Sequence, residues 1–305
     1  MKISIIGAGQ VGATTALMLA EKEVANEVVL IDIVESVKGK ALDMMCSSPV
    51  DAFSCSVTGS CDYEQIKDSD IVVITAGLAR TPGMTREDLL EKNKRIVEGV
   101  CENIVKYAPN SILIVVTNPL DVICYVVFKK TGFKKEKVIG MAGVLDSTRL
   151  RNFIASELNV SPKDVQGLVL GSHGDSMVPL PEYTTVNGIP ITQLMDKEKI
   201  DKIVERTRNC GAEIVSYLKT GSAYYSPASS ITEMIEAIAK DQKRVLPASV
   251  YLEGEYGYDG IFLGVPIKLG KNGVEEIIKI RLNNEAKKVL DKSAEITKDN
   301  IKRLK

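Results

Sequence analysis

Several residue types are scarce in this sequence, and each scarcity narrows the class of protein. The 305 residues include no tryptophan, 1 histidine and 5 phenylalanines. The 39 Lys and Arg residues balance 40 Asp and Glu residues, which leaves a formal net charge of -1. A chain this close to neutrality has no global field that would draw it to nucleic acid or anionic lipid. We therefore expect neither nucleic acid nor a membrane as a partner, and any recognition of charge must be local.

Long apolar runs and paired cysteines are also missing. No segment approaches the roughly 18 apolar residues of a membrane span, and the apolar run at the N-terminus is too short for a signal peptide. The six cysteines form no CxxC pair, and Cys101 and Cys124 lie inside apolar helical patterns. This predicts buried thiols rather than disulfides or metal ligands, a reducing compartment and a cytoplasmic protein.

The first half alternates short Val/Ile runs with longer helical patterns. The apolar runs lie at 3–6, 28–31, 71–74, 112–116 and 138–141. Continuous apolar strands separated by helices indicate a parallel sheet that is covered on both faces. The sequence therefore predicts an α/β fold, with a doubly wound parallel (Rossmann) sheet forming a dinucleotide-binding domain in residues 1–141.

The second half, 142–305, has a different texture. Two helical patterns, a β-rich stretch with several glycines and a final helix cover, in order, 146–158, 196–240, about 245–269 and about 273–303. No internal repeat, low-complexity tract or flexible linker separates the two halves. We therefore expect an α+β substrate domain that is docked on the first domain.

A glycine-rich turn follows the first apolar run. Gly7, Gly9 and Gly12 form G-x-G-x-x-G before an apolar helical pattern, and Asp32 ends the second predicted strand. The three glycines permit, in order, a tight turn, close approach of a pyrophosphate, and close packing of helix on strand. Asp32 can accept hydrogen bonds from both adenosine ribose hydroxyls and would repel a 2′-phosphate. The arrangement predicts NAD, rather than NADP, as the cofactor.

The single histidine, His173, lies between Gly171 and Gly174 after an apolar run. A lone imidazole is usually an ordinary surface or core residue, but flanking glycines let a ligand approach it closely. Asp146 and Arg149 are three residues apart, on one face of a predicted helix. The pattern leaves two interpretations open. One is a solvent-facing ion pair or helix cap, and the other is an aspartate that orients an imidazole beside an arginine that binds a carboxylate.

Polar residues also follow two further strands. Arg80 and Arg86 stand in LARTPGMTR, directly after the strand predicted at 71–74, and Asn118 follows the strand predicted at 112–116. Open α/β sheets bind their ligands at the carboxyl ends of their strands. Each residue also has an ordinary interpretation, namely a solvated loop cation for Arg80 and a helix cap for Asn118.

Over essentially its whole length, the chain resembles the lactate/malate dehydrogenase family. The motifs that it shares, in order and approximate spacing, are GAGQVG, VVLIDI, ITAGLARTPGMTR, VVTNPLD, LDSTRLR and GSHGDS. Within this family, the likeness is greatest to malate dehydrogenases of the lactate-dehydrogenase-like type. The resemblance implies an NAD-dependent oxidoreductase that interconverts malate and oxaloacetate, and a homodimer or homotetramer.

The resemblance also implies roles for individual residues. His173 would exchange the hydroxyl proton, Asp146 would orient it, and Arg149 would bind the C1 carboxylate in a bidentate fork. Arg86 would polarise the reacting carbonyl oxygen. Arg80 occupies the position where lactate dehydrogenases carry glutamine, and it would pair with the second carboxylate of a dicarboxylate substrate.

The remaining implied contacts concern the cofactor and the size of the substrate pocket. Ala223 stands where lactate dehydrogenases usually have threonine, and the smaller side chain leaves room for a longer diacid. Asn118 would contact both the substrate and the nicotinamide end of the cofactor. The implied cofactor contacts are Gly7, Ala8, Gly9, Gln10, Val11, Gly12, Asp32, Asn93, Val116, Thr117 and Asn118. The rival hypotheses are a lactate or other 2-hydroxyacid dehydrogenase and a non-catalytic NAD-binding protein.

Overall fold

The protein is described here by a computed structural model that covers residues 1–78 and 85–304. Six strands of the first half pair in parallel, in the order β3-β2-β1-β4-β5-β6. Their bounds are β1 (Lys2–Ile6), β2 (Glu27–Ile31), β3 (Ser56–Ser60), β4 (Ile71–Ile74), β5 (Ile112–Val115) and β6 (Val138–Gly140). The strand order reverses direction between β1 and β4, which is where open α/β sheets bind dinucleotides.

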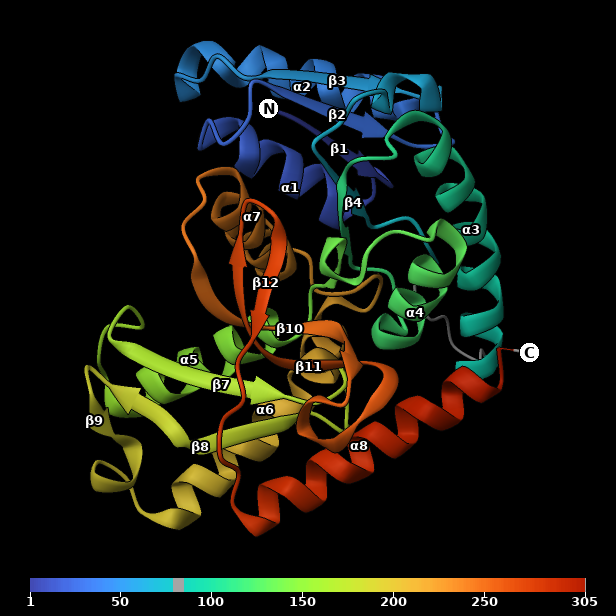
Figure 1. The fold of residues 1–305 in the computed structure, drawn as a ribbon. Helices are drawn as coiled ribbons and strands as arrows, with labels where there is room; N and C mark the ends of the chain where they lie inside the picture. Colours follow the sequence, from blue (N-terminus) through green and yellow to red (C-terminus); the bar gives the residue numbers. More distant parts are fainter. Residues whose placement is uncertain (79–84, 305) are drawn as a thin grey trace.

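Helices cover both faces of this sheet (Figure 1). The helices of the first half are α1 (Gln10–Glu21), α2 (Ser36–Asp51), α3 (Arg86–Tyr107) and α4 (Leu120–Thr131). Ile3 and Ile5 of β1 pack in one apolar cluster with α1, whereas Ile6 packs in a second cluster with α3 and α4. Because successive side chains of a strand point to opposite faces, this division shows that both faces are buried.

A sequence signal marks the start of α3. The Thr85 hydroxyl accepts the Asp88 N–H at 3.0 Å, and the Asp88 carboxylate accepts the Thr85 N–H at 3.1 Å. This capping box satisfies two N–H groups that a helix otherwise leaves unpaired. The loop after β4 therefore ends, and α3 begins, at Arg86.

The second half adds strands to the same sheet. Its strands are β7 (Val165–Leu170), β8 (Val178–Val186), β9 (Ile189–Pro190), β10 (Arg244–Glu253), β11 (Asp259–Gly270) and β12 (Gly273–Ile277). β10 pairs antiparallel with β6 through Ser249 and Gly140, so that β10, β11 and β12 complete a nine-stranded sheet. β7, β8 and β9 form a separate three-stranded sheet. The predicted fold class is confirmed, but the two halves share a sheet instead of merely touching.

The remaining helices connect and cover these strands. They are α5 (Gly143–Leu158), α6 (Lys197–Leu218), α7 (Tyr225–Ala239) and α8 (Asn284–Lys302), with short 3-10 helices at η1 (Tyr63–Ile66), η2 (Lys135–Lys137), η3 (Ile191–Gln193) and η4 (Glu255–Gly257). In Figure 1, α8 crosses the molecule and its end meets α3, where Arg303 pairs with Glu87 at 2.7 Å. The domain boundary predicted at 141/142 lies between β6 and α5.

Two predicted helix boundaries were wrong. Residues 273–277 form β12 instead of the start of the final helix, because α8 begins only where the Asn283 side chain accepts the Ala286 N–H at 2.8 Å. Helix α5 begins at Gly143, three residues before its predicted start. A Cβ at position 143 would lie 2.6 Å from the Pro247 Cβ, so this first turn packs tightly against β10.

The cysteines are free thiols, and Cys101 and Cys124 are buried as predicted. Burial raises the pKa of the Cys101 thiol to about 12, so it stays protonated and inert near neutral pH. In the part of the chain that the structure describes, every helix is too short or too polar to cross a bilayer.

Candidate active site

The carboxyl ends of the parallel strands open into a cavity of about 780 Å³. Its walls come from the glycine turn after β1, the loops after β4 and β5, α5, the loop between β7 and β8, and the segment between α6 and α7. The predicted residues that line it are Gly9, Gln10, Val11, Gly12, Val116, Thr117, Asn118, Arg149, His173 and Ala223. The fold therefore brings residues from both halves of the chain to one cavity.

The three glycines of the turn have different structural requirements. Gly7 has a φ of 105°, and a Cβ there would lie 2.6 Å from the Ala76 nitrogen. A Cβ at Gly12 would lie 1.9 Å from the Gly7 carbonyl oxygen, whereas a Cβ at Gly9 would meet nothing within 4 Å. The fold thus needs glycine at 7 and 12. At position 9 the missing side chain leaves open space on the cavity wall, as close approach of a pyrophosphate requires.

Asp32 lies beside this turn, at the end of β2. Its Oδ2 accepts the Ala8 N–H at 2.7 Å, and its Oδ1 accepts the Val34 N–H at 3.2 Å. Lys40 of α2 donates to the Ala8 carbonyl oxygen on the same turn. Each carboxylate oxygen has more than one lone-pair site, so Asp32 keeps acceptor capacity for ribose hydroxyls. Together with the open face at Gly9, these residues fit the NAD predicted from the sequence.

The lone histidine makes a buried pair with Asp146. The His173 Nδ1 lies 2.9 Å from the Asp146 Oδ2, and the Asp146 side chain is only 2% exposed. Because the carboxylate occupies Nδ1, the other ring nitrogen, Nε2, is left to exchange a proton in the cavity. Burial lowers the pKa of the His173 imidazole, but the charge and hydrogen bond of Asp146 raise it and outweigh both burial and the charge of Arg149.

Arg149 lies on α5, one helical turn after Asp146. Its Nη1 is 3.4 Å from the Asp146 Oδ1, and its side chain is 10% exposed. Its Nε is buried and has no hydrogen-bond partner among the described residues. An unpaired buried N–H is costly, and a guanidinium offers two parallel N–H groups to a carboxylate. This geometry excludes the solvent-facing ion pair and favours a carboxylate-binding arginine.

Two asparagines stand at different depths. Asn118 is exposed to the cavity, and the N-cap position of α4 is Pro119, so that Asn118 is not the helix cap. Asn93 is fully buried; its Oδ1 accepts the Leu78 N–H at 2.7 Å, and its Nδ2 donates to the Leu78 and Asn118 carbonyl oxygens at 3.2 and 2.6 Å. Asn93 therefore holds the backbone of the two loops that follow β4 and β5. Its contact with a cofactor stays a prediction.

The side chains of two predicted site residues, Arg80 and Arg86, are not among those that the structure describes. Arg80 lies outside the described residues. Arg86 begins α3, but its side chain also lies outside the described part of the chain. Their predicted roles therefore stay predictions.

The sequence did not single out Asp121, which contacts the histidine, or Ser249, which contacts Asp121. The Asp121 Oδ2 accepts the His173 backbone N–H at 2.9 Å, and the Ser249 hydroxyl donates to the Asp121 Oδ1 at 2.6 Å. A carboxylate in the apolar pattern LDVICYVV was the available signal, because such a group is seldom buried without a task.

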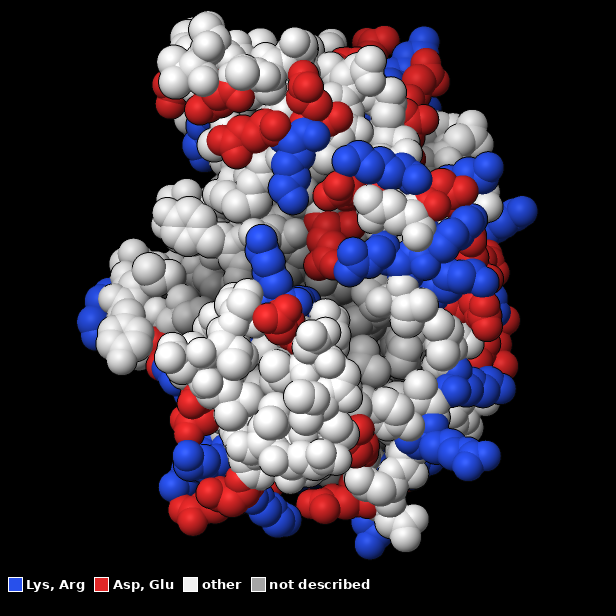
Figure 2. Space-filling view, turned by 90° about the vertical axis from the view of Figure 1, so that its left-hand side faces the viewer, with Lys and Arg blue, Asp and Glu red and all other residues white. Residues whose placement is uncertain are grey.

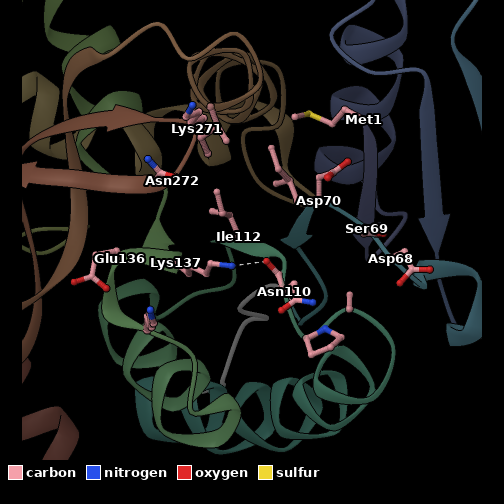
Figure 3. Close-up of a pocket in the computed structure, with 15 residues that line it drawn as sticks. Met1, Asp68, Ser69, Asp70, Asn110, Ile112, Glu136, Lys137, Lys271 and Asn272 are labelled. Atoms are coloured by element: carbon pink, nitrogen blue, oxygen red, sulfur yellow. Dashed lines mark hydrogen bonds between the residues drawn. The ribbon is translucent and has the colours of Figure 1, made fainter.

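A second cavity, of about 690 Å³, lies at the opposite edge of the sheet (Figure 3). Asp68, Asp70, Lys137 and Lys271 stand around it, and Lys137 donates to the Asn110 carbonyl oxygen. The residues that line it include none of those predicted for the site.

In Figure 2, Lys and Arg side chains are interspersed with Asp and Glu, so that the visible face carries both signs of charge.

The carboxyl-edge cavity defines a class of protein. A glycine turn with an acidic residue at the end of β2 faces a buried histidine–aspartate pair and a buried arginine, as a nicotinamide-dependent dehydrogenase of hydroxy acids requires. The family profile described as lactate/malate dehydrogenase, NAD binding domain, matches residues 1–140, and that of the alpha/beta C-terminal domain matches residues 143–305. The chain belongs to the lactate/malate dehydrogenase family.

Relatives in this family are similar over their full length. The malate dehydrogenase of Chlorobium limicola is 59% identical over 305 residues, covering 100% of this chain and 98% of the relative. That of Bacillus subtilis is 56% identical over 304 residues, covering 99% and 97%. These relatives confirm the prediction of a malate dehydrogenase, and the NAD-binding domain confirms the predicted cofactor.

Solved structures agree on the fold. The malate dehydrogenase of Salinibacter ruber has a TM-score of 0.96 at 52% identity, covering 100% of this chain and 97% of the other. A lactate dehydrogenase of Cryptosporidium parvum, complexed with lactic acid and nicotinamide adenine dinucleotide, also has a TM-score of 0.96, at 42% identity with coverage of 99% and 97%. The fold alone therefore does not choose between the two substrates.

Proposed function

We propose that the protein catalyses reversible hydride transfer between malate and NAD, which yields oxaloacetate and NADH. The observation that carries this proposal is the His173–Asp146 pair beside the unsatisfied Nε of Arg149, across one cavity from the open face at Gly9. Bound NAD supplies the acceptor for the hydride that leaves C2 of malate. The side chains of the protein have to bind the substrate and move one proton.

Proton transfer falls to His173. In malate oxidation, neutral Nε2 accepts the proton of the C2 hydroxyl while the C2–H bond breaks and a carbonyl forms. The resulting imidazolium is stabilised by the Asp146 carboxylate, 2.9 Å from Nδ1. In oxaloacetate reduction the same nitrogen returns the proton to the carbonyl oxygen.

Substrate orientation falls to Arg149. A bidentate pair between its guanidinium and the C1 carboxylate would satisfy the buried Nε–H and fix the plane of the acid. Asn118, which lines the same cavity, would contact the substrate beside it. Lysine at 149 could not reproduce this fork, because an ammonium is a point charge.

Preference for a four-carbon diacid would come from Arg80, with Ala223 providing room. Malate and oxaloacetate would neutralise the guanidinium of Arg80, whereas lactate or pyruvate would leave it unpaired in a desolvated site. Such an unpaired charge costs several kcal/mol, which is enough for strong discrimination. The names of the curated relatives support the same choice.

The test is an NADH absorbance assay with oxaloacetate and pyruvate at equal concentration. The wild-type protein is expected to prefer oxaloacetate. Arg80→Gln should depress turnover of oxaloacetate by at least about tenfold and raise activity on pyruvate relative to it. Arg95→Gln, at an exposed position on α3, is the matched control and should change neither. An unchanged preference in Arg80→Gln would contradict the specificity argument, and NADH binding without turnover would indicate a non-catalytic protein.

Assembly and location are proposed on separate grounds. Large apolar side chains are exposed on α2, α6 and α7, among them Leu42, Val50, Tyr217 and Tyr225. Exposed apolar surface of this kind favours a homodimer or homotetramer. A solution mass of 33.2 kDa by light scattering, which is the mass of one chain, would refute the proposed oligomer.

The six free cysteines support a location in the reducing cytoplasm, where the reaction would serve the tricarboxylic acid cycle.

A further inference from the structure

A second aspartate reaches His173 from a different helix. Asp121, in the first turn of α4, is 4% exposed. Both of its carboxylate oxygens are hydrogen-bonded, Oδ2 to the His173 backbone N–H at 2.9 Å and Oδ1 to the Ser249 hydroxyl at 2.6 Å. The carboxylate thus connects α4, the loop between β7 and β8, and β10. These three segments meet at the Asp121 carboxylate, next to the backbone of His173.

Further contacts hold the same loop. Gly171 and Gly264 of β11 exchange backbone hydrogen bonds of 2.9 and 3.1 Å, and a Cβ at Gly264 would lie 2.4 Å from the Gly171 carbonyl oxygen. The Ser172 N–H donates to the Ser293 hydroxyl of α8 at 2.8 Å. These contacts fix the two residues that precede His173, and the Asp121 contact fixes the backbone of the histidine itself.

Burying a carboxylate is expensive unless something compensates it. Burial raises the pKa of Asp121, while the Ser249 hydroxyl and the His173 N–H lower it. Two neutral donors compensate only part of the cost of a negative charge, and the imidazolium formed on His173 supplies the opposite charge. Asp121 and His173 therefore stabilise each other most when the ring is protonated.

The charged groups that face the imidazole are few. Within the described residues, Asp146 and Arg149 face it from α5 and Asp121 faces it from α4, while Asp175 lies two residues further along its own loop. The elements β10, β11 and α8 present the uncharged residues Ser249, Gly264 and Ser293 to this loop. Both Asp146 and Asp121 raise the pKa of the His173 imidazole, whereas the charge of Arg149 lowers it.

We propose that Asp121 is a positioning residue for proton transfer: it anchors the backbone of His173 and supplies a second negative charge that favours the protonated ring. Asp146 holds the ring by its Nδ1, and Asp121 holds the same residue by its main chain. Asp121 belongs to α4, in the first half of the chain, and Asp146 belongs to α5, in the second half. Both halves of the chain therefore position His173. This inference rests on the proposed function for its catalytic meaning but not for its electrostatic test.

His173 is the only histidine, so that one imidazole resonance in an NMR titration reports it without assignment. Asp121→Asn keeps the size of the side chain and an acceptor for the His173 N–H but removes the charge. The pKa of the imidazole should fall by about half a unit or more. Ser249→Ala is the matched control, since it removes one hydrogen bond from Asp121 and keeps the carboxylate. It should leave the histidine pKa near the wild-type value.

The kinetic readout follows from the sign of this shift. Oxaloacetate reduction needs the protonated ring, so kcat/KM falls as pH rises through the pKa of His173. Asp121→Asn should move that fall to lower pH, with at least about a threefold greater loss at pH 9 than at pH 6. A loss that is equal at every pH, with an unshifted NMR titration, would assign Asp121 a merely structural role and overturn the proposal.

Controls separate this inference from the proposed function. If the wild-type protein binds NADH but does not reduce oxaloacetate, the proposed function fails while the NMR comparison still tests Asp121. If Asp121→Asn does not fold, Asp121→Ser carries the same expected shift. In the wild-type protein itself, an imidazole that titrates below the ordinary value for histidine would overturn the proposal without any variant.

Discussion

The two edges of the main sheet carry cavities of similar volume, about 780 Å³ at the carboxyl edge and about 690 Å³ at the amino edge. They differ in how their charged groups are held. At the carboxyl edge, the Asp146 side chain is 2% exposed and the Arg149 side chain 10% exposed, and Asp146 contacts both Arg149 and His173. At the amino edge, Asp68 and Lys271 are exposed side chains from separate loops. A volume is therefore a poor sign of function, and buried charges in mutual contact are a better one.

Chain direction explains the difference. In parallel α/β units each helix follows the carboxyl end of a strand, so the N-termini of α1 and α5 lie at the same edge as the cavity. Their free N–H groups and partial positive charge favour anions such as a pyrophosphate or a carboxylate. The amino edge instead receives helix C-termini such as that of α3, whose partial negative charge does not favour anions, and the Tyr107 carbonyl oxygen there already accepts the Asp68 N–H at 3.1 Å.

The largest expected effect is that of His173→Asn. Asparagine can still hydrogen-bond to Asp146 but cannot exchange a proton near neutral pH. Oxaloacetate reduction should fall by about 10²–10⁴-fold, which is the usual contribution of a general acid–base. NADH binding, measured by fluorescence, should be retained because the glycine turn is untouched. Near-normal turnover would show that another group moves the proton and that the comparison of the two edges misplaces the chemistry.

A smaller effect is expected at the glycine turn, where two alanine variants separate ligand approach from folding. A Cβ at Gly9 meets nothing within 4 Å, so Gly9→Ala should cost at most about 1 kcal/mol of stability. It should still weaken NADH binding by about tenfold, because the new methyl group occupies the face that the pyrophosphate approaches.

Gly12→Ala is the matched variant. Its Cβ would lie 1.9 Å from the Gly7 carbonyl oxygen, so α1 would have to move away from the strand. This variant should lose about 1–3 kcal/mol or more of folding stability, measured by thermal or denaturant unfolding. If Gly9→Ala and the wild-type protein bind NADH with equal affinity, the proposal that the cofactor binds against the face at Gly9 is wrong.

Local signals in the sequence predicted the elements that have local causes. The G-x-G-x-x-G spacing predicted the turn between β1 and α1. Elements without such signals were missed. Helix α2 has few buried residues, and β3 has a mixed burial pattern, so neither shows a clear apolar period.

The site divides in the same way. The motifs supplied the candidate residues and the resemblance to a family implied their roles, but the contacts between these residues depend on pairings that no local spacing encodes. Asp146 and His173 are 27 residues apart, and Ser249 is 128 residues from Asp121. The contact between Asp121 and Ser249 depends on the pairing of β10 with β6, which the sequence did not indicate because the second half was expected to form a docked α+β unit.

The smallest expected effect lies at the amino edge, and it tests the comparison directly. Lys271→Met removes an exposed positive charge from the rim of that cavity while keeping an unbranched side chain of similar length. Surface substitutions of this kind change stability by about 0.5 kcal/mol or less. The kcat and KM for oxaloacetate and the affinity for NADH should match the wild-type values. A change in any of them beyond about twofold would mean that the amino-edge cavity is coupled to catalysis, since Lys271 reaches none of the groups that hold His173.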